Sequence, residues 1–404
     1  MYPTIYHVFY DWFGWEIPFF KLLNSFGFFV AVAFVAASWV LGKELKRKEE
    51  GGLFKPEKRK VILGKPVQWS DVIINAFIGF IMGWKIVWLI MNAGDLFVPG
   101  TMPQEHIFSM AGYPLMGLLF AALLGGWKWF DYHSKRLPEP QEKVVLFHAW
   151  EYTGSITMIA AIFGIVGAKF FHLFENPAEF MQFFKNPTLD NFLSGLTVFG
   201  GLIVAAIALG VFAWRKNLPL LHMGDSLAPS FVLAYGIGRI GCQVSGDGDW
   251  GIVNTAPKPF FLDWIPDNLW AYDYPNNVNG VGVKIPHNSV MEIYEGYGTF
   301  LNPPVFPTPI YETLIMFAIF AAVWFSRKRC HIPGFIFAIC LMCIGVERFF
   351  IEKIRVNNHF DFLGMQVTQA EVISTLLFFT GGFLVYFFYK NQLSSREWKK
   401  WGKT

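Results

Sequence analysis

Charged residues are scarce in this sequence. Only 16% of the 404 residues are Asp, Glu, Lys or Arg, whereas 54% are hydrophobic and 19% are aromatic. Mean hydropathy is +0.38. A soluble domain of this length does not need so much apolar surface, so the composition excludes an ordinary soluble protein and indicates a polytopic membrane protein. The net charge of +3 is too small to predict a nucleic-acid partner.

Cysteine is scarce as well. The four cysteines are not arranged as a disulfide framework, because Cys242 follows an arginine, Cys330 lies in a basic loop, and Cys340 and Cys343 lie inside an apolar run. We expect neither a metal nor a cofactor. The first residues contain no basic segment and no small-residue cleavage site, so we expect no removable signal peptide.

Long apolar runs dominate the sequence. Nine of them are long enough, or nearly so, to cross about 30 Å of hydrocarbon. They lie near residues 24–42, 71–92, 107–127, 150–174, 191–214, 225–244, 308–326, 332–352 and 370–389. With nine spans, all five basic stretches fall on one side, which we expect to be the cytoplasm. These stretches lie at 43–60, 135–136, 215–216, 327–329 and 396–403. The sequence therefore predicts an all-α polytopic fold of about nine transmembrane helices, with the N-terminus outside and the C-terminus in the cytoplasm.

The longest polar stretch between spans, 247–306, predicts a small periplasmic head. Short alternating runs at 281–285 and 290–294 indicate mixed or β structure there. The expected organisation is an N-terminal periplasmic segment, a first span, a basic loop, a transmembrane hairpin, a core with an arginine motif, the head, a C-terminal core and a basic tail. The N-terminal segment is 1–23, the first span 24–42, the basic loop 43–70, the hairpin 71–127, the core with the arginine motif 150–246, the head 247–306, the C-terminal core 307–390 and the tail 391–404.

An internal repeat is visible at an offset of 84 residues. Residues 76–126 aligned without gaps on 160–210 give 14 identities in 51 positions. Apolar helices match one another by composition, but the shared residues include a lysine, an asparagine and a proline, which are not generic membrane residues. We therefore predict that the hairpin 71–127 is a duplicate of 155–211.

Residues 225–251 carry the strongest functional signal. They begin as an apolar helix, place Arg239 among glycines, and end in polar and acidic residues. An arginine at the centre of a membrane helix costs about 2.5–3.5 kcal/mol on insertion scales. A chain that keeps one there usually needs its charge to bind a partner group. Its guanidinium group matches a lipid phosphate bidentately. The alternative is a structural ion pair with Asp247 or Asp249.

Three glycines around Arg239 form the pattern G-x-G-x-x-G at Gly236, Gly238 and Gly241. A dinucleotide site is excluded by the context, because no strand precedes the pattern and the segment lies within the bilayer. Small residues also allow close helix packing. We expect that they additionally let a lipid headgroup approach the backbone and Arg239.

A second polar constellation ends the eighth span. Arg348, Glu352 and Arg355 are spaced to share one helix face, and Arg348 facing Arg239 would form a two-cation clamp for a phosphodiester. The alternative is an interfacial cap of snorkelling side chains.

Tyr311 and Glu312 open the seventh span, where a carboxylate must find a cation. We expect Asp225, at the start of the sixth span, to complement the dipole of its own helix. His287 in the head is more often a surface residue, but it remains a candidate base.

These motifs resemble the bacterial prolipoprotein diacylglyceryl transferase family. The resemblance covers roughly 24–42 and 150–390. It is carried by Gly238-Arg239-Ile240-Gly241, Ser245-Gly246-Asp247, Trp250-Gly251, Pro307 to Glu312, Arg348 with Glu352 and Arg355, Gly200-Gly201-Leu202, and Asp225. Members generally have seven spans, so the hairpin 71–127 would be an addition.

The resemblance implies transfer of a diacylglyceryl group from phosphatidylglycerol to the lipobox cysteine of a prolipoprotein signal peptide, in the bacterial inner membrane. Arg239 and Arg348 would stabilise the departing phosphate, and Glu352, Asp247 and Tyr311 would orient the arginines and the headgroup. The implied substrate-binding residues are Arg239, Gly238, Gly241, Cys242, Tyr311, Glu312, Arg355, Phe199, Gly200 and Gly201.

The sequence departs from the family pattern at three positions. Phe199 stands where the family has a histidine, Cys242 where it has an asparagine, and Phe26 where it has a tyrosine. Another base, with His287 or Asp247 as candidates, would then be needed. The alternatives are a different lipid donor or acceptor, a non-catalytic lipid-binding scaffold, or a transporter.

Overall fold

The computed structural model describes residues 1–92, 109–176, 195, 197–286, 289, 293–294, 296–357, 359–362 and 364–401. Its contacts divide the chain into two units. One comprises Met1–Pro3, Asn24–Lys55 and Ala149–Thr404, and the other comprises Thr4–Leu23 and Pro56–His148. Each unit is described by itself.

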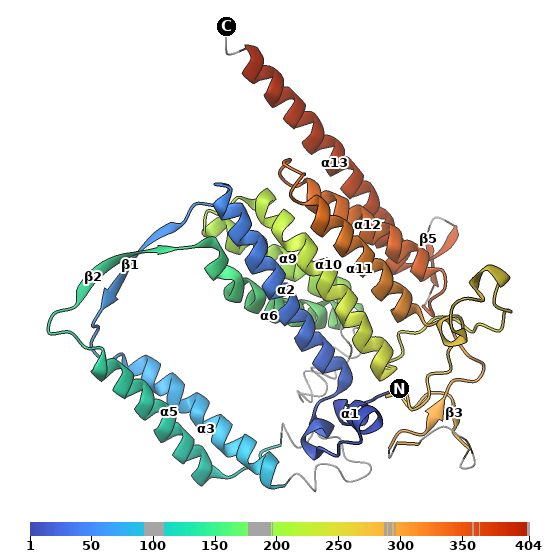
Figure 1. The fold of residues 1–404 in the computed structure, drawn as a ribbon, viewed down its shortest axis with the longest axis horizontal. Helices are drawn as coiled ribbons and strands as arrows, with labels where there is room; N and C mark the ends of the chain where they lie inside the picture. The colour runs from blue at the N-terminus through green and yellow to red at the C-terminus, as the bar shows by residue number, and fades with distance from the viewer. Residues whose placement is uncertain are drawn as a thin grey trace. The chain divides into compact units, whose positions relative to one another are not determined.

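The larger unit is a helical bundle arranged around α10. Its long helices are α2 (Ser25–Glu50), α6 (Thr153–Glu175), α9 (Val198–Arg215), α10 (Leu220–Ser245), α11 (Thr308–Ser326), α12 (Phe335–Glu352) and α13 (Gln369–Trp401), and the short η3 (Ala149–Tyr152) precedes α6. Helix α10 packs against α2, α11 and α12, while α13 packs on α12 and α9 packs on α6 (Figure 1). The most buried apolar cluster therefore lies between α10, α11 and α12, at Ala228, Val232, Met316, Val323, Ile336 and Cys340.

The outer surfaces of these helices are apolar. Trp39, Ile207 and Phe379 are 58%, 62% and 68% exposed, which water would not favour but hydrocarbon would. Six described helical segments are long and apolar enough to cross a membrane: Ser25–Glu50, Trp69–Met91, Ala149–Glu175, Val198–Arg215, Thr308–Ser326 and Gln369–Asn391. The chain is thus a largely helical, multi-pass membrane protein.

Each of the nine apolar runs overlaps a described helix of at least 18 residues, and six described helical segments are also apolar enough to be candidate spans. Helix α12 is not one of the six, since Glu347, Arg348 and Glu352 lie in this 18-residue helix. The residues that carry the polar site lower the apolar character of the helix that holds them.

Helix α10 begins before the predicted start of the span at residue 225. Asp225 therefore lies inside the helix, and the expectation that it complements the dipole of its own helix is wrong. Its carboxylate accepts hydrogen bonds from the backbone N–H groups of Gly334 at 2.8 Å and Phe337 at 3.0 Å. It thus caps the N-terminus of α12 from the neighbouring helix.

The smaller unit contains a helical hairpin formed by α3 and α5. The elements of this unit are α1 (Ile5–Phe13), η1 (Pro18–Leu22), β1 (Glu57–Leu63), α3 (Trp69–Met91), α5 (Pro114–Ser134) and β2 (Gln141–Phe147). Strands β1 and β2 pair antiparallel, with Glu57 opposite Phe147, and α3 packs along α5 (Figure 1).

Contacts inside the α3–α5 hairpin recur at the 84-residue offset inside the α6–α9 hairpin. Tyr113 N–H donates to Trp84 C=O at 2.9 Å, and Thr197 N–H donates to Ala168 C=O at 3.1 Å. The Asn92 side chain donates to Trp88 C=O, and the Asn176 side chain donates to His172 C=O. Each pair of donors, and each pair of acceptors, differs by 84 residues.

The same close contact between two helices occurs inside each hairpin. A Cβ atom added to Gly83 would lie 2.3 Å from Met116 O, and one added to Gly167 would lie 2.7 Å from Gly200 O. Only glycine allows the helix backbones to approach so closely.

The head is small and mostly irregular. Strands β3 (Val283–Lys284) and β4 (Thr299–Phe300) pair antiparallel, and η4 (Phe260–Leu262) and η5 (Asp267–Leu269) precede them. Its core consists of Tyr274, Leu301 and Val305. The predicted run 281–285 contains β3, whereas most of 290–294 lies outside the described residues. A second strand pair, β5 (His359–Phe362) with β6 (Met365–Thr368), precedes α13.

Candidate functional site

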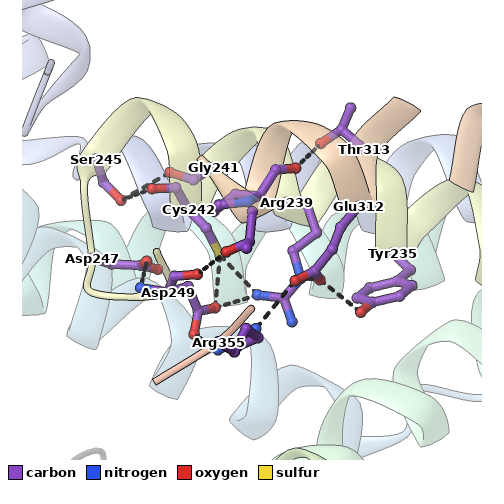
Figure 2. Close-up of polar contacts among 12 residues, drawn as sticks. Tyr235, Arg239, Gly241, Cys242, Ser245, Asp247, Asp249, Glu312, Thr313 and Arg355 are labelled. Carbon is purple, nitrogen blue, oxygen red and sulfur yellow. Dashed lines mark hydrogen bonds and ion pairs between the residues drawn. The ribbon is translucent and has the colours of Figure 1, made fainter. Parts of the chain in front are cut away.

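Four segments of the larger unit bring charged side chains together at one end of the bundle. Arg239 comes from the second half of α10, and Asp249 comes from the loop that follows it. Glu312 lies just after the first turn of α11, and Arg355 lies just beyond α12. Figure 2 shows these side chains converging, with Tyr235 beside Glu312. We call Arg239, Asp249, Glu312, Arg348, Glu352 and Arg355 the arginine cluster.

Arg239 is held by two carboxylates. Its Nη1 atom forms an ion pair with Asp249, and its Nε atom forms one with Glu312. The guanidinium carbon also lies 5.2 Å from the centre of the Tyr235 ring, within range of a cation–π interaction. Of the two acids that the sequence offered as partners, the structure pairs Arg239 with Asp249.

Glu312 is the centre of the cluster. Its side chain has no solvent exposure, and its Oε1 atom lies 3.2 Å from Nη1 of Arg355 and 3.9 Å from Nη1 of Arg348. Tyr235 donates a hydrogen bond of 2.8 Å to Oε2. Since Arg355 also pairs with Asp249, the four side chains Arg239, Asp249, Arg355 and Glu312 form a closed ring of alternating charge.

Arg348 and Glu352 extend this ring along α12. They share a helix face, as their spacing predicts, and Nη2 of Arg348 lies 3.0 Å from Oε2 of Glu352. The Asn357 side chain donates to Oε1 of Glu352 at 2.6 Å. Helix α12 ends at Glu352, so the expectation that Arg355 lies on the same helix face is wrong. Three residues past the helix end, it reaches the ring from an irregular segment.

Each arginine keeps a buried nitrogen that makes no hydrogen bond among the described residues. These atoms are Nε of Arg239, Nη1 of Arg348 and Nε of Arg355. The contacts of the first two with Glu312 are ion pairs without hydrogen-bond geometry. A buried donor whose hydrogen bond is not made costs about 1–3 kcal/mol, so a further acceptor beside these nitrogens would stabilise the cluster.

A backbone bridge fixes Arg355 against the loop that carries Asp249. Gly251 pairs with Arg355 in an antiparallel β-bridge, and Ile252 N–H donates to Ile354 C=O at 2.8 Å. Thr308 at the start of α11 donates to Asp249 C=O at 2.7 Å. The ring therefore depends on backbone contacts as well as on charge.

Gly251 is required at this bridge because a Cβ atom there would lie 2.5 Å from Ile354 O and 2.8 Å from Phe306 Cβ. We expect Gly251→Ala to lower the free energy of unfolding by about 1–3 kcal/mol, as overpacking does. Gly210→Ala is the matched control, since a Cβ atom there meets nothing within 4 Å. Unfolding of both variants in detergent measures the difference, and equal stabilities would contradict the proposed role of the bridge.

The ring also predicts a dependence on pH. Burial raises the pKa of Asp249, but the guanidinium groups of Arg239 and Arg355 outweigh burial and lower it to about 2. A carboxylate with a lowered pKa stabilises the fold above its unfolded pKa of about 3.9, and this contribution is lost as the pH falls towards 2.

We therefore expect the thermal midpoint of the wild type to fall more steeply between pH 4 and pH 2 than that of Asp249→Asn. Thermal unfolding of both proteins in detergent across this range measures the two slopes. Parallel curves would show that Asp249 is not held as an anion by the arginines.

The glycines around Arg239 divide into two kinds. A Cβ atom on Gly236 would lie 2.8 Å from the Phe317 ring, and one on Gly241 would lie 3.0 Å from Phe29 Cβ. These two glycines therefore pack α10 closely on α11 and α2. A Cβ atom on Gly238 would meet nothing within 4 Å, so this glycine faces open space.

Other residues predicted for the site lie at its edge or elsewhere. The Tyr311 hydroxyl donates to Leu269 C=O at 2.7 Å, which ties α11 to the head. Gly200 and Gly201 pack α9 on the backbone of α6, and Phe199 lies half-buried in the same first turn of α9. His287 lies outside the described residues.

Asp247 lies next to the ring rather than in it. Its Oδ1 atom accepts a long hydrogen bond of 3.4 Å from Asp249 N–H, and burial raises its pKa. Cys242 is buried, with its Sγ atom 3.4 Å from Asp249 Oδ2 and 3.7 Å from Arg239 Nη1. Ligand atoms of Cys242, Asp247 and Asp249 lie within 4.8 Å of one another. The guanidinium groups on Asp249 would repel a metal cation there.

Two residues of the site were not identified from sequence. Tyr235 gave no signal, because an aromatic residue in an apolar helix is ordinary. Glu347 directly precedes Arg348 in the eighth predicted span. A carboxylate within a membrane span could have been identified from sequence as a candidate functional residue. It is 4% exposed, and neither of its carboxylate oxygens has a hydrogen-bond partner among the described residues.

Comparison with known proteins identifies the family. The family model described as "Prolipoprotein diacylglyceryl transferase" matches residues 106–387. This range includes α5 and excludes α2, whereas the expected coverage was 24–42 and 150–390.

Curated relatives named phosphatidylglycerol–prolipoprotein diacylglyceryl transferase align with more than half of the chain. The relative from Corynebacterium glutamicum is 28% identical over 246 residues, which is 59% of this chain and 70% of the relative. The one from Bifidobacterium adolescentis is 27% identical over 221 residues, 52% of this chain and 59% of the relative. A Streptomyces coelicolor relative, whose name ends in "2", is 23% identical over 258 residues, 63% of this chain and 68% of the relative. The chain belongs to the prolipoprotein diacylglyceryl transferase family.

Proposed function

We propose that this protein transfers a diacylglyceryl group from phosphatidylglycerol to the lipobox cysteine thiol of prolipoproteins and releases glycerol phosphate. The observation that carries the proposal is the set of three largely covered arginines around Glu312, each with one buried nitrogen that makes no hydrogen bond among the described residues. Phosphate oxygens are the acceptors that guanidinium groups match best. The names of the curated relatives agree with this activity.

The reaction makes and breaks one bond at a glyceryl carbon. The thiol loses its proton, its sulfur bonds to the carbon, and the bond from that carbon to a phosphate oxygen breaks with its electron pair on the oxygen. Negative charge therefore grows on the departing phosphate. Arg239 and Arg348, together with Arg355, would stabilise this charge, and their fixed ion pairs remove the need to reorganise during the reaction.

The carboxylates of the cluster would position these arginines. Glu312 and Asp249 hold Arg239 and Arg355, and Glu352 holds Arg348. The open space at Gly238 would admit the lipid headgroup beside Arg239. Cys242, Tyr311 and the Phe199–Gly201 turn would line the wider site.

We infer nine membrane spans with the N-terminus outside and the C-terminus in the cytoplasm of a bacterial cell, in its inner membrane. Nine long helices among the described residues, together with the basic residues that follow alternate spans, support this topology. It places the head and the arginine cluster at the outer leaflet, where a prolipoprotein signal peptide presents its cysteine.

We further infer that the α3–α5 hairpin is a copy of the α6–α9 hairpin. Identical residues, backbone hydrogen bonds and glycine contacts recur at one offset of 84 residues. Since the copy has Leu115 and Met116 in place of Phe199 and Gly200, it would not reproduce the turn of the family motif.

The test is transfer of labelled diacylglyceryl from phosphatidylglycerol vesicles to a lipobox peptide by the purified protein. We expect transfer to a cysteine peptide and none to the matching serine peptide. Vesicles of phosphatidylethanolamine test a second lipid as the donor. Transfer from phosphatidylethanolamine alone would indicate another lipid donor. Vesicle binding without transfer would indicate a lipid-binding scaffold, and either result would contradict the proposal.

A further inference from the structure

One buried acid of α12 forms no ion pair with the arginines among the described residues. The arginine cluster contains three positive and three negative side chains, so its charges balance. Each of its three carboxylates lies within ion-pair distance of at least one guanidinium group. Glu347 is a fourth acid beside this balanced set, and it is buried like Glu312 and Glu352. Both of its oxygens lack a hydrogen-bond partner among the described residues.

The position of Glu347 places it beside the cluster and deeper in the bundle. It precedes Arg348 on α12, so its side chain leaves the helix about 100° away from that of Arg348. Five residues separate it from Glu352, which corresponds to about 7.5 Å along the helix axis. The charges that act on it are those of Glu312, Arg348, Arg239 and Arg355, and it also interacts with Tyr235.

Among the described residues, no Lys or Arg side chain of α13 forms an ion pair with the Glu347 carboxylate. Where α12 and α13 touch, Gly345 packs on the backbone of Ser374 and Phe378. The acid of α13 nearest in sequence to this contact, Glu371, pairs with Lys353 at 2.5 Å. Among the described residues, Glu347 thus differs from the buried acids Glu312, Glu352 and Glu371 in forming no ion pair.

The unsatisfied groups of the site are of two complementary kinds. Three guanidinium nitrogens and both Glu347 oxygens make no hydrogen bond among the described residues, although two of the nitrogens lie within ion-pair distance of Glu312. A phosphate supplies acceptors, whereas a thiol supplies a donor. A carboxylate held by arginine is a weak base, because the cation stabilises its charged form. An unpaired carboxylate accepts a proton more readily.

We propose that Glu347 is the catalytic proton acceptor for the substrate thiol. This assignment rests on the proposed function and answers the question raised by Phe199, which cannot accept a proton. The thiol proton passes to a Glu347 oxygen as sulfur bonds to the glyceryl carbon and the carbon–oxygen bond breaks. Glu347 then returns the proton to the departing phosphate monoester, so that protons and charge balance over one turnover.

The experiment compares cysteine and selenocysteine lipobox peptides on wild type and Glu347→Gln in phosphatidylglycerol vesicles. A selenol is a much stronger acid than a thiol and is ionised at neutral pH without a base. With the cysteine peptide we expect Glu347→Gln to lower kcat about 100-fold, as general-base removal does, with little change in KM. With the selenocysteine peptide we expect the variant to approach the wild-type rate.

Two further variants separate chemistry from folding. Glu347→Asp keeps a carboxylate and should retain more turnover of the cysteine peptide than Glu347→Gln. Glu44→Gln changes another buried acid, which pairs with Arg327 at the far end of α11, and its folded fraction should turn over at the wild-type rate.

The outcomes are distinguishable. Equal losses with both peptides, or wild-type turnover of the cysteine peptide by Glu347→Gln, would overturn the role of Glu347 and leave the transferase activity in place. If the folded wild type transferred to neither peptide, the proposed function itself would be overturned, and this assignment with it.

Discussion

Replacing Arg239 with alanine is expected to lower diacylglyceryl transfer by about 10²–10³-fold or more in kcat, the usual effect of removing one preorganised donor from a developing anion. Arg239 contacts both Asp249 and Glu312, and its Nε atom makes no hydrogen bond among the described residues. The variant removes a charge-stabilising group and also opens the ring that positions Arg355.

Arg239→Lys separates these two effects. Lysine keeps the positive charge but lacks the planar fork that binds a carboxylate or phosphate bidentately. We expect this variant to fold, because a cation remains beside Asp249 and Glu312, and still to lose most of its turnover. Arg215→Ala, an exposed arginine at the end of α9, is the matched control and should leave turnover unchanged. Full turnover by Arg239→Lys would show that charge alone is sufficient.

Replacing Glu312 with glutamine is expected to destabilise the protein by about 3–5 kcal/mol, because it leaves buried arginines without their shared anion. Glu312 lies within ion-pair distance of all three arginines of the cluster. The neutral amide preserves the size of the side chain, so the loss isolates the charge. Chemical unfolding in detergent measures the change.

An exposed ion pair provides the comparison. Lys60 and Glu142 lie 2.9 Å apart across β1 and β2, with side chains that are 72% and 58% exposed. Such pairs contribute about 0–1 kcal/mol, so Glu142→Gln should leave the unfolding curve almost unchanged. Similar curves for the two variants would show that the ring does not stabilise the fold.

The sequence predicts the helices well because their signals are local. Each of the nine apolar runs overlaps a described long helix, and the spacing of Arg348 and Glu352 correctly places both on one helix face. The 84-residue repeat was also visible in the sequence, since the glycines and asparagines that make its contacts are among the identities.

The geometry of the site was less accessible, because loops decide it. Arg239 had two acids within ten residues, and only the turn after α10 selects Asp249. Arg355 lies beyond the end of α12, and its position depends on a β-bridge to Gly251 that links residues far apart in the sequence. Asp225 caps a helix other than its own. None of these contacts follows from helical spacing.

Mass spectrometry of the lipobox peptide after incubation with wild-type protein in phosphatidylglycerol vesicles, with glycerol phosphate quantified in parallel, tests the central claim most directly. We predict a diacylglyceryl thioether on the cysteine, one glycerol phosphate released per thioether, and loss of both products in Arg239→Lys. Folded wild-type protein that forms no thioether, or that releases glycerol phosphate without modifying the peptide, would contradict this account.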